Sequence, residues 1–408
     1  MFKRYSGWMV VGMFGLLGCE TPPVVAGGRQ SCAMRDGRVR CWGGGEYGVL
    51  GYGNTNNIGD NEHPRSAGDV SVGGNVQQLA LGYYHTCALL DTGRVRCWGR
   101  NDYGQLGLNR TDSIGDDELA SAGGEVALAE SAIQITAGIY HTCALLASHN
   151  VRCWGYGRFG ALGLGNTNNI GDNELPSSVP TVSLGGLVDQ VVAGGAHTCA
   201  RLSDGNVRCW GSNSTGALGL AGTATIGDNE LPTSVPALAL GSPALEIAVG
   251  ELHSCARLRT GIKCWGHGVS GQLGYASTSD VFLPSSVGFV NFGGSALKLT
   301  AGGSHTCVLT DVPEVRCWGE GLWGALGYAN RLNIGDNELP VSAGAVSLGG
   351  TPVSVSAGFD HTCATVSASD TYHVRCWGYG GDGRLGYDAT ATIGDDEVPS
   401  SVPFALVE

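Results

Sequence analysis

The sequence contains few charged residues, and those present are mostly acidic. Asp, Glu, Lys and Arg make up 14% of the 408 residues, and 36 acidic against 23 basic side chains give a formal net charge of −13 at pH 7. A negative chain repels phosphate backbones, so this balance argues against nucleic acid as a partner. Beyond the first twenty residues there is no apolar run of membrane-spanning length, so we expect no transmembrane helix there.

Several catalytic motifs are also missing. The sequence has no Gly-x-Ser-x-Gly elbow, no P-loop and no His-Glu-x-x-His pair. We therefore expect no enzyme activity, no catalytic residues, no cofactor and no metal site. Gly, in contrast, accounts for 69 residues, which favours many short strands joined by tight turns.

The N-terminus has the pattern of a bacterial export signal. Lys3 and Arg4 precede an apolar stretch that is too short for a mature membrane-spanning helix. This stretch ends in Leu16-Leu17-Gly18-Cys19, which resembles the lipobox of bacterial lipoproteins, whose cysteine is acylated. We predict that residues 1–19 are a lipoprotein signal peptide and that Cys19 is lipidated. An ordinary secretory signal is the alternative.

The other fourteen cysteines form seven pairs whose first members recur every 52 to 56 residues. Residues 20–408 are therefore expected to contain seven copies of one unit. The pairs are Cys32 with Cys41, Cys87 with Cys97, Cys143 with Cys153, Cys199 with Cys209, Cys255 with Cys264, Cys307 with Cys317, and Cys363 with Cys376.

The two cysteines of each pair lie on the two strands of a predicted β-hairpin. A two-residue turn at Asp36-Gly37 places Cys32 opposite Cys41, and the three-residue loop of the second copy places Cys87 opposite Cys97. The turn changes length while the cysteines stay in register, although the longer turn of the last copy weakens the argument there. Directly opposed residues lie within disulfide range, so we predict seven cross-strand disulfides in an exported protein.

Zinc is the competing interpretation of these cysteines, because His85-Thr86-Cys87 and Cys97 could supply ligands. Seven separate sites would be needed, and the first copy has Gln30 in place of the histidine. We therefore interpret the recurring histidines as structural residues. The tryptophans of the seven Cys-Trp-Gly motifs are likewise expected to pack between units.

The repeated text Gly-x-x-His-(Ser/Thr), Val-x-Cys-Trp-Gly and Gly-x-Leu-Gly resembles the regulator of chromosome condensation family, across about residues 24–407. The chain is similar to the bacterial secreted branch, which includes β-lactamase inhibitory protein II. The resemblance implies an all-β, seven-bladed β-propeller with four short antiparallel strands per blade. We further expect the segment Ser401 to Val407 to complete the sheet of the first blade and so close the ring.

Six copies carry an acidic loop, Ile-Gly-Asp-(Asn/Asp)-Glu, at residues 58–62, 114–118, 170–174, 226–230, 334–338 and 393–397. An Arg precedes the second cysteine in six copies, whereas the fifth copy has Lys263 and lacks the acidic motif. This correlation favours a structural Arg–carboxylate pair. Calcium binding and plain solvated turns remain the alternatives.

Hairpin geometry brings two variable segments to one end of each unit. These are the pair in Gly-x-x-His and the four residues after Cys-Trp-Gly. Aromatic side chains there are typical of protein interfaces, and they also stack on sugars. The predicted binding face comprises Tyr47, Tyr83, Tyr84, Tyr103, Tyr140, Phe159, Trp323 and Phe359.

The sequence thus predicts an exported, monomeric, lipid-anchored propeller of the cell envelope that binds a protein, as a scaffold or enzyme inhibitor. A carbohydrate-binding or glycan-hydrolysing propeller is the first alternative, with acids around the central channel such as Glu251, Asp360 or Asp382. A guanine-nucleotide exchange regulator, the activity of the family's eukaryotic founder, is the second. The predicted signal and the acidic charge argue against that one. Glu20 after the lipidated cysteine would direct a Gram-negative lipoprotein to the outer membrane.

Overall fold

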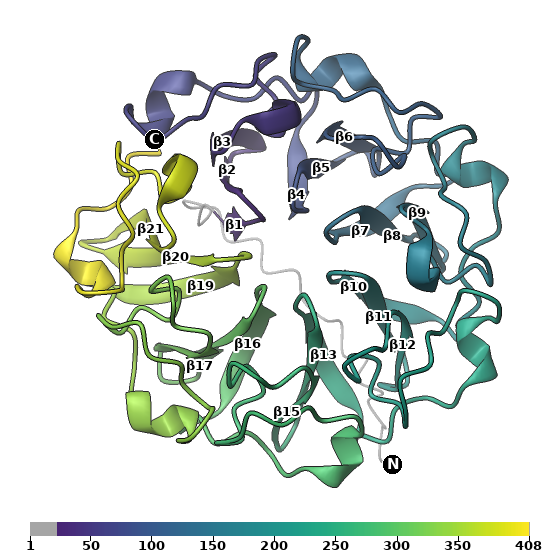
Figure 1. Ribbon diagram of the computed structural model, residues 1–408. Coiled ribbons are helices and arrows are strands. Elements are labelled where there is room, and N and C mark those ends of the chain that lie inside the picture. The colour runs from purple at the N-terminus through teal and green to yellow at the C-terminus, as the bar shows by residue number, and fades with distance from the viewer. Residues whose placement is uncertain (1–22, 408) are drawn as a thin grey trace, which may run out of the picture.

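The computed structural model describes residues 23–407 and shows seven antiparallel sheets arranged radially around a central channel (Figure 1). This arrangement confirms the predicted seven-bladed propeller. Each blade is built from one contiguous stretch of chain, and the prediction for Cys19 lies outside the described residues. No helix within residues 23–407 has the length and apolar character needed to cross a membrane.

Every blade contains an inner, a middle and an outer strand. The inner strands are β1 (Val24–Ala26), β4 (Val76–Leu81), β7 (Ala132–Ala137), β10 (Val188–Ala193), β13 (Ala244–Val249), β16 (Ala296–Ala301) and β19 (Thr351–Ala357). The middle strands are β2 (Gln30–Arg35), β5 (His85–Leu90), β8 (His141–Leu146), β11 (His197–Leu202), β14 (His253–Leu258), β17 (His305–Thr310) and β20 (His361–Ala368). The outer strands are β3 (Arg38–Gly43), β6 (Val95–Gly99), β9 (Val151–Gly155), β12 (Val207–Gly211), β15 (Gly261–Gly266), β18 (Val315–Gly319) and β21 (Thr371–Gly378).

Short 3₁₀ turns complete the secondary structure of the described chain. They are η1 (Glu46–Gly48), η2 (Pro64–Ala67), η3 (Ala120–Gly123), η4 (Arg158–Gly160), η5 (Pro176–Ser178), η6 (Pro232–Ser234), η7 (Pro284–Ser286), η8 (Pro340–Ala343), η9 (Gly381–Gly383) and η10 (Pro399–Ser401). We call the end of the disc that carries the Gly-x-x-His segments the loop face. The end that carries the hairpin turns between middle and outer strands is the tip face.

The middle strands are buried on both sides because each blade packs against two neighbours. In β5 and β8, which both read His-Thr-Cys-Ala-Leu-Leu, all six side chains are buried, so apolar and polar residues do not alternate and the buried His and Thr need partners inside the protein. The seven tryptophans of the Cys-Trp-Gly motifs have no exposed surface. Their predicted role in packing between blades is confirmed.

The prediction of four strands per blade was wrong in one respect. The fourth, outermost segment makes a single backbone hydrogen bond to the outer strand, as from Val126 N–H to the Val95 carbonyl at 2.8 Å. Buried side chains such as Val182 and Leu184 hold this segment instead of a ladder of hydrogen bonds. Each sheet is therefore three-stranded.

The predicted closure of the ring was also wrong. Ala405 pairs with Val374 of β21, so the C-terminal segment belongs to the seventh blade and not to the first. It still contacts the first blade, because Arg40 Nη1 donates to the Val407 carbonyl at 2.7 Å. The ring is thus closed by the same kind of side-chain contacts that join the other blades.

A repeated polar node joins neighbouring blades. A backbone carbonyl in one blade accepts two hydrogen bonds of 2.9–3.0 Å from the next, one from the Trp indole and one from the Thr or Ser hydroxyl before the first cysteine. Val49, for example, accepts from Trp98 and Thr86.

A histidine completes each of six such nodes, at 2.8–2.9 Å from the same hydroxyl oxygen. The hydroxyl hydrogen is already donated to the carbonyl, so Nε2 of the histidine is the donor. We call these the seam histidines: His85, His141, His197, His253, His305 and His361. The seventh position is Gln30, whose amide nitrogen donates to the Gly82 carbonyl at 3.2 Å. The predicted structural role of the histidines is confirmed.

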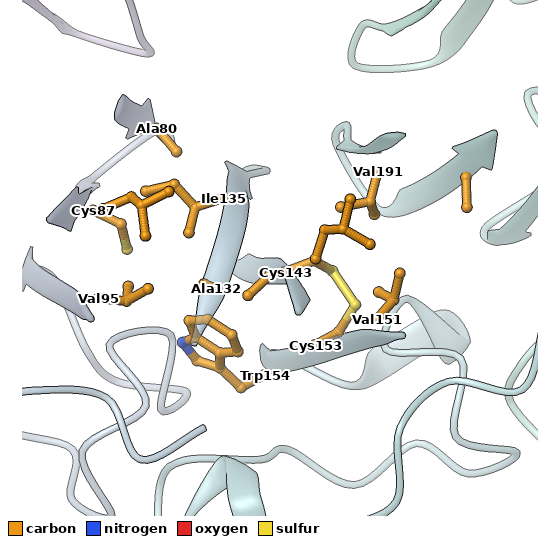
Figure 2. Close-up of a cluster of buried hydrophobic side chains, with 14 of the residues drawn as sticks. Ala80, Cys87, Val95, Ala132, Ile135, Cys143, Val151, Cys153, Trp154 and Val191 are labelled. Atoms are coloured by element: carbon orange, nitrogen blue, oxygen red, sulfur yellow. A yellow bond between two sulfur atoms is a disulfide. The ribbon is translucent and has the colours of Figure 1, made fainter. Parts of the chain in front are cut away.

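All seven predicted disulfides are present, between directly opposed residues with Cα separations of 4.0–4.1 Å. The longer turn of the last blade does not disturb this register. Figure 2 shows the bond of the third blade among the apolar side chains that pack between neighbouring blades, together with Trp154. The bonds join Cys32 to Cys41, Cys87 to Cys97, Cys143 to Cys153, Cys199 to Cys209, Cys255 to Cys264, Cys307 to Cys317, and Cys363 to Cys376.

We predict that reductant alone leaves the folded protein unchanged. The bonded cysteines are at most 2% exposed, so a thiolate reaches them only after a blade opens. Each bond closes a loop of about ten residues and is worth roughly 2–3 kcal/mol through the unfolded chain. Alkylation and mass measurement should therefore count no free thiols in residues 20–408 after dithiothreitol treatment without denaturant. Stepwise release of thiols from the folded protein would contradict this.

The basic residue before the second cysteine does not pair with the acidic loop, contrary to the prediction. It binds backbone carbonyls of the following segment, as Arg208 does with Pro232 at 3.2 Å and Lys263 with Pro284 at 2.8 Å. Where such an arginine has a carboxylate partner, as in Arg40–Asp69 at 2.7 Å, that carboxylate lies outside the acidic motif.

The acidic loops instead pack against the neighbouring blade. The first residue of the motif bridges to the end of the outer strand, and the Glu accepts a hydrogen bond from the motif's own Gly, as Glu174 does from Gly171 at 3.1 Å. The backbone of that Gly lies against the Gly-x-Leu-Gly turn of the preceding blade, so that a Cβ on Gly171 would lie 2.4 Å from the Gly104 carbonyl oxygen. In the exceptional fifth copy, Phe282 takes this place beside Gly216.

Candidate interaction face

The two variable segments of each blade converge on the loop face, as predicted. Tyr84, from the Gly-x-x-His segment, lies against Tyr47, which follows a Cys-Trp-Gly motif in the neighbouring blade, with 5.4 Å between ring centroids. Tyr103 and Tyr140 make the same contact one blade further on, at 5.6 Å. Each aromatic pair therefore spans the boundary between two blades.

Six of the eight predicted residues belong to one cluster, which extends over the seventh, first, second and third blades. On one side, Phe359 contacts Tyr83 at 4.9 Å, and Tyr83 contacts Tyr84 at 4.6 Å. On the other side, Tyr156 contacts both rings of the Tyr103–Tyr140 pair. The members are Tyr47, Tyr83, Tyr84, Tyr103, Tyr140 and Phe359, joined by Tyr156, and we call them the aromatic cluster.

Arg100 lies at the centre of the aromatic cluster and joins its two sides, and sequence reasoning missed it. Its guanidinium is 4.9 Å from the ring centroid of Tyr47 and 5.6 Å from that of Tyr140, and Asp102 binds it at 2.6 Å. Burial opposes the charge of Arg100, but Asp102 and the surrounding tyrosines outweigh this effect, so its pKa is raised. Arg100 directly follows Cys-Trp-Gly, as Tyr156 and Tyr379 do in their blades. This shared position was the sequence signal that could have placed it on the loop face.

Phe159 and Trp323 lie apart from the aromatic cluster. Phe159 contacts Arg158, whose guanidinium is 4.8 Å from the ring, and Trp323 packs against Tyr379 at 5.0 Å. Tyr47, Phe159 and Trp323 are the three exposed members of the predicted set, at 38–41%. The other five are half-buried because their rings pack on one another.

Three glycines separate most of the larger residues around the channel mouth on the loop face, although Tyr83 and Ile139 are neighbours. The first variable residue of Gly-x-x-His is a glycine at positions 28, 195 and 303, and each glycine makes room for the larger residue of the next blade: Tyr83, Glu251 or Phe359. A Cβ on Gly28 would lie 2.5 Å from the Tyr83 Cα. The channel behind this rim has a volume of about 380 Å³ and is lined by the inner strands.

Three carboxylates lie on the opposite side of this mouth from the second and third blades. Burial raises the pKa of Glu251, and Asp360 and Glu320 raise it further. Burial likewise raises the pKa of Glu320 and of Asp360. Asp382, predicted beside them, is engaged elsewhere, because Arg29 and Arg384 bind it at 2.6 and 3.0 Å.

Two of the acidic loops gather three carboxylates within 4.8 Å: Asp116, Asp117 and Glu118, and Asp395, Asp396 and Glu397. Burial and Asp396 raise the pKa of Glu397 to about 7. Asp395 is also bound by Arg331 of the preceding blade at 2.6 Å. These loops fit the contact between blades described above, and calcium binding stays a hypothesis.

Tyr47 and Phe159 share an unusual backbone conformation, with φ of 59° and 60°. Bulky residues rarely adopt this left-handed region, and such strain is commonly retained where a side chain serves binding. Asp382 occupies the same position in its blade, with φ of 62°.

We predict that Phe159→Gly leaves stability within about 1 kcal/mol of the wild type, because relief of the backbone strain offsets the lost ring contacts. Trp323→Gly is the matched control, since Trp323 occupies the same loop position without a positive φ, and it should cost about 1–2 kcal/mol. Denaturant unfolding measures both. Equal losses for the two variants would contradict the prediction.

Fold and site together define a disulfide-bonded β-propeller with an aromatic loop face. Residues 16–296 match the RCC1-like domain, and the chain belongs to this family. It is similar to the ultraviolet-B receptor UVR8 of Arabidopsis thaliana, at 29% identity over 89% of this chain and 78% of that protein. It is also similar to the probable E3 ubiquitin-protein ligase HERC4 of Mus musculus, at 30% identity over 86% of this chain but 31% of the ligase.

Among solved structures, yeast RCC1 (Prp20), crystallised with Kap60, matches with a TM-score of 0.67 and 19% identity. The match covers 85% of this chain and 80% of that one. At this identity the likeness supports the fold.

Proposed function

We propose that this protein is an exported, lipid-anchored, non-enzymatic propeller that binds a protein partner through its loop face, as a scaffold or as an inhibitor of an envelope enzyme. The aromatic cluster around Arg100 is the observation that carries the proposal. Tyr, Trp and Arg are the side chains that contribute most at protein interfaces. Tyr47, Phe159 and Trp323 extend from this face into solvent.

The geometry supports a protein over a glycan. Sugars stack on open ring faces, whereas Tyr47–Tyr84 and Tyr83–Phe359 pack edge to face, with interplanar angles of 76° and 85°. A glycan hydrolase would also need two free acids beside the aromatic rings. Asp102 is bound by Arg100, whereas Glu251 and Glu320 belong to the fifth and sixth blades. Asp360, which follows Phe359, is the acid that keeps this alternative in view. A glycan-binding propeller is thus the second candidate.

Export and anchoring rest on the lipobox pattern that ends at Cys19. The seven disulfides support an oxidising compartment, because such bonds persist outside the reducing cytosol. Nucleotide exchange takes place in the cytosol or nucleus, so these bonds weigh against that alternative.

A pull-down from cell envelope and culture supernatant tests the proposal. The bait is the chain from Glu20 onward, and the test variant carries Tyr47→Ser, Phe159→Ser and Trp323→Ser. Val312→Ser, which changes a side chain 65% exposed in a hairpin turn of the opposite tip face, is the matched control. A protein retained by the wild type and the control but lost with the triple variant supports the proposal. Retention by all three baits, or of glycan alone, contradicts it.

A further inference from the structure

The inner strands carry a β-bulge at one recurring position. In the second to seventh blades the register slips by one residue, as between Ala132 and Gln134 in β7. A bulge leaves one residue outside the ladder and re-aims its side chain. The six bulged residues are all exposed: Gln77, Ile133, Asp189, Leu245, Leu297 and Val353.

These bulges lie at the tip face. The starts of β4, β7, β10 and β13 hydrogen-bond to the hairpin turn of the preceding blade, as Ala132 N–H does to the Gly93 carbonyl at 2.9 Å. Two further aliphatic residues occupy the same end. Leu187 accepts a hydrogen bond from Ser203 of a hairpin turn, and Val312 lies in a turn itself.

Together these residues form an exposed aliphatic crescent over the third to seventh blades. Ile133, Leu187, Leu245, Leu297 and Val312 are 45–65% exposed, and Val353 is 37% exposed. Two charged residues beside the crescent are paired, Asp189 with Arg201 at 3.5 Å and Glu246 with Arg257 at 2.8 Å. Asp204, Arg259 and Asp311 lie exposed in the neighbouring hairpin turns and form no ion pair within residues 23–407. The crescent is therefore an apolar surface whose edge carries single charges of both signs.

The chain enters the propeller at this same end. Met34, near the first hairpin turn, donates its N–H to the Pro23 carbonyl at 3.1 Å, and β1 runs from there toward the loop face. Cys19 is four residues before Pro23, so it can lie at most about 14 Å from it. An anchor on Cys19 would hold the tip face, and not the loop face, close to the membrane.

We infer that the aliphatic crescent docks on the lipid bilayer that anchors Cys19, with its side chains at the boundary between headgroups and acyl chains. The inference rests on the proposed lipid anchor. Exposed aliphatic side chains add to the binding that an acyl chain supplies, which alone is marginal. Docking turns the disc so that the loop face lies about 20 Å from the membrane, one strand length away, and is open to a partner.

The test places a polarity-sensitive dye on either face of the full, acylated chain in vesicles of phosphatidylethanolamine and phosphatidylglycerol. Leu245→Cys labels the crescent, and Ser214→Cys, exposed on the loop face, is the matched control. We expect the dye at position 245 to shift to shorter emission wavelength and to be quenched by lipids brominated near the headgroups. The dye at 214 should do neither. Adding Ile133→Ser and Leu297→Ser should lower the docked population on the order of tenfold.

Three outcomes would overturn the inference: a water-exposed dye at 245 in vesicles, equal shifts at 245 and 214, or a shift at 245 that grows with protein concentration without vesicles. The last would identify a second copy as the occupant. Mass measurement of the N-terminal peptide tests the anchor separately. If Cys19 carries no acyl group, the proposed anchor fails. Coupling a chain that begins at Cys19 to a maleimide lipid then tests docking alone.

Discussion

The protein should lose stability steeply as pH falls from 6.5 toward 4. Burial lowers the pKa of His85, His197 and His253 to about 3 and of His141 and His305 to about 4. The pKa of His361, the sixth seam histidine, is also well below its usual value. In the unfolded chain these groups titrate near 6.5.

The sign follows from proton binding. Above pH 6.5 the seam histidines are neutral in the folded and the unfolded state, so they do not lower the free energy of unfolding. Below 6.5 the unfolded chain takes up protons that the folded chain excludes, so unfolding becomes more favourable. Each group contributes about 1.4 kcal/mol per pH unit, and six together on the order of 8 kcal/mol per unit. A typical domain has about 5–15 kcal/mol in total.

Some carboxylates act in the opposite direction. Burial raises the pKa of Glu251, Glu320 and Asp360, and burial together with Asp396 raises the pKa of Glu397 to about 7. The folded state therefore binds their protons more tightly and gains stability as pH falls. These carboxylates are half-buried and fewer than the six fully buried histidines, so the histidines should dominate. Free energies of unfolding by guanidinium at pH 7.5, 6.5 and 5.5, with disulfides intact, measure the sum.

His197→Gln is the matched control, because Gln30 occupies this position in the first blade. The Gln side chain does not titrate, and its amide can donate to a backbone carbonyl of the next blade, as Gln30 does to Gly82 at 3.2 Å. The bond of 2.9 Å from His197 to Ser254 is lost. Unfolding of the variant should take up one proton fewer, so its free energy of unfolding should fall less steeply with pH than that of the wild type. At pH 7.5 that free energy should be lower than the wild type's by at most about 2 kcal/mol. An unchanged slope between pH 6.5 and 5.5 would show that the seam histidines are not its source.

The hairpins and their disulfides could be predicted from the sequence because they are local. Opposed cysteines such as Cys87 and Cys97 are separated by a turn whose length constrains the register. The number of blades followed from repetition. The closure of the ring could not be predicted. Whether Ala405 pairs with β21 or with β3 depends on contacts between segments that are distant in the chain, and the local sequence does not report them.

The arginine contacts were mispredicted for a similar reason. Charge complementarity suggested carboxylates, but Arg208 donates from Nη1 to the carbonyls of Pro232 and Val235, in a segment that folds back without a ladder of hydrogen bonds. On the loop face, the aromatic residue types could be predicted from their positions. Their mutual packing could not, because it depends on how neighbouring blades are rotated. The central place of Arg100 and the exposure of the bulged aliphatic residues therefore emerged from the structure.

Gly104→Ala should abolish folding or cost about 3–5 kcal/mol, because it places a methyl group inside the contact between two blades. Gly104 has a φ of +77°, and a Cβ there would lie 2.3 Å from the Asp172 amide nitrogen and 2.5 Å from the Gly171 carbonyl carbon. Both atoms are backbone, so neither can move without shifting the acidic loop of the neighbouring blade.

Gly165→Ala is the control that separates backbone strain from the steric clash. Gly165 has a similar φ of +72°, but a Cβ there would meet its nearest neighbour, Leu231, only at 3.5 Å. Ala276 and Ala329 occupy the equivalent position in other blades with φ of 54° and 57°, so Gly165→Ala should cost only about 1–2 kcal/mol. Thermal and denaturant unfolding of both variants, at pH 7.5 with disulfides intact, give the comparison. If Gly104→Ala costs no more than Gly165→Ala, the acidic loops do not lock the blades together. Their Ile-Gly-Asp motif would then need another explanation, with calcium binding by the clustered carboxylates the first to test.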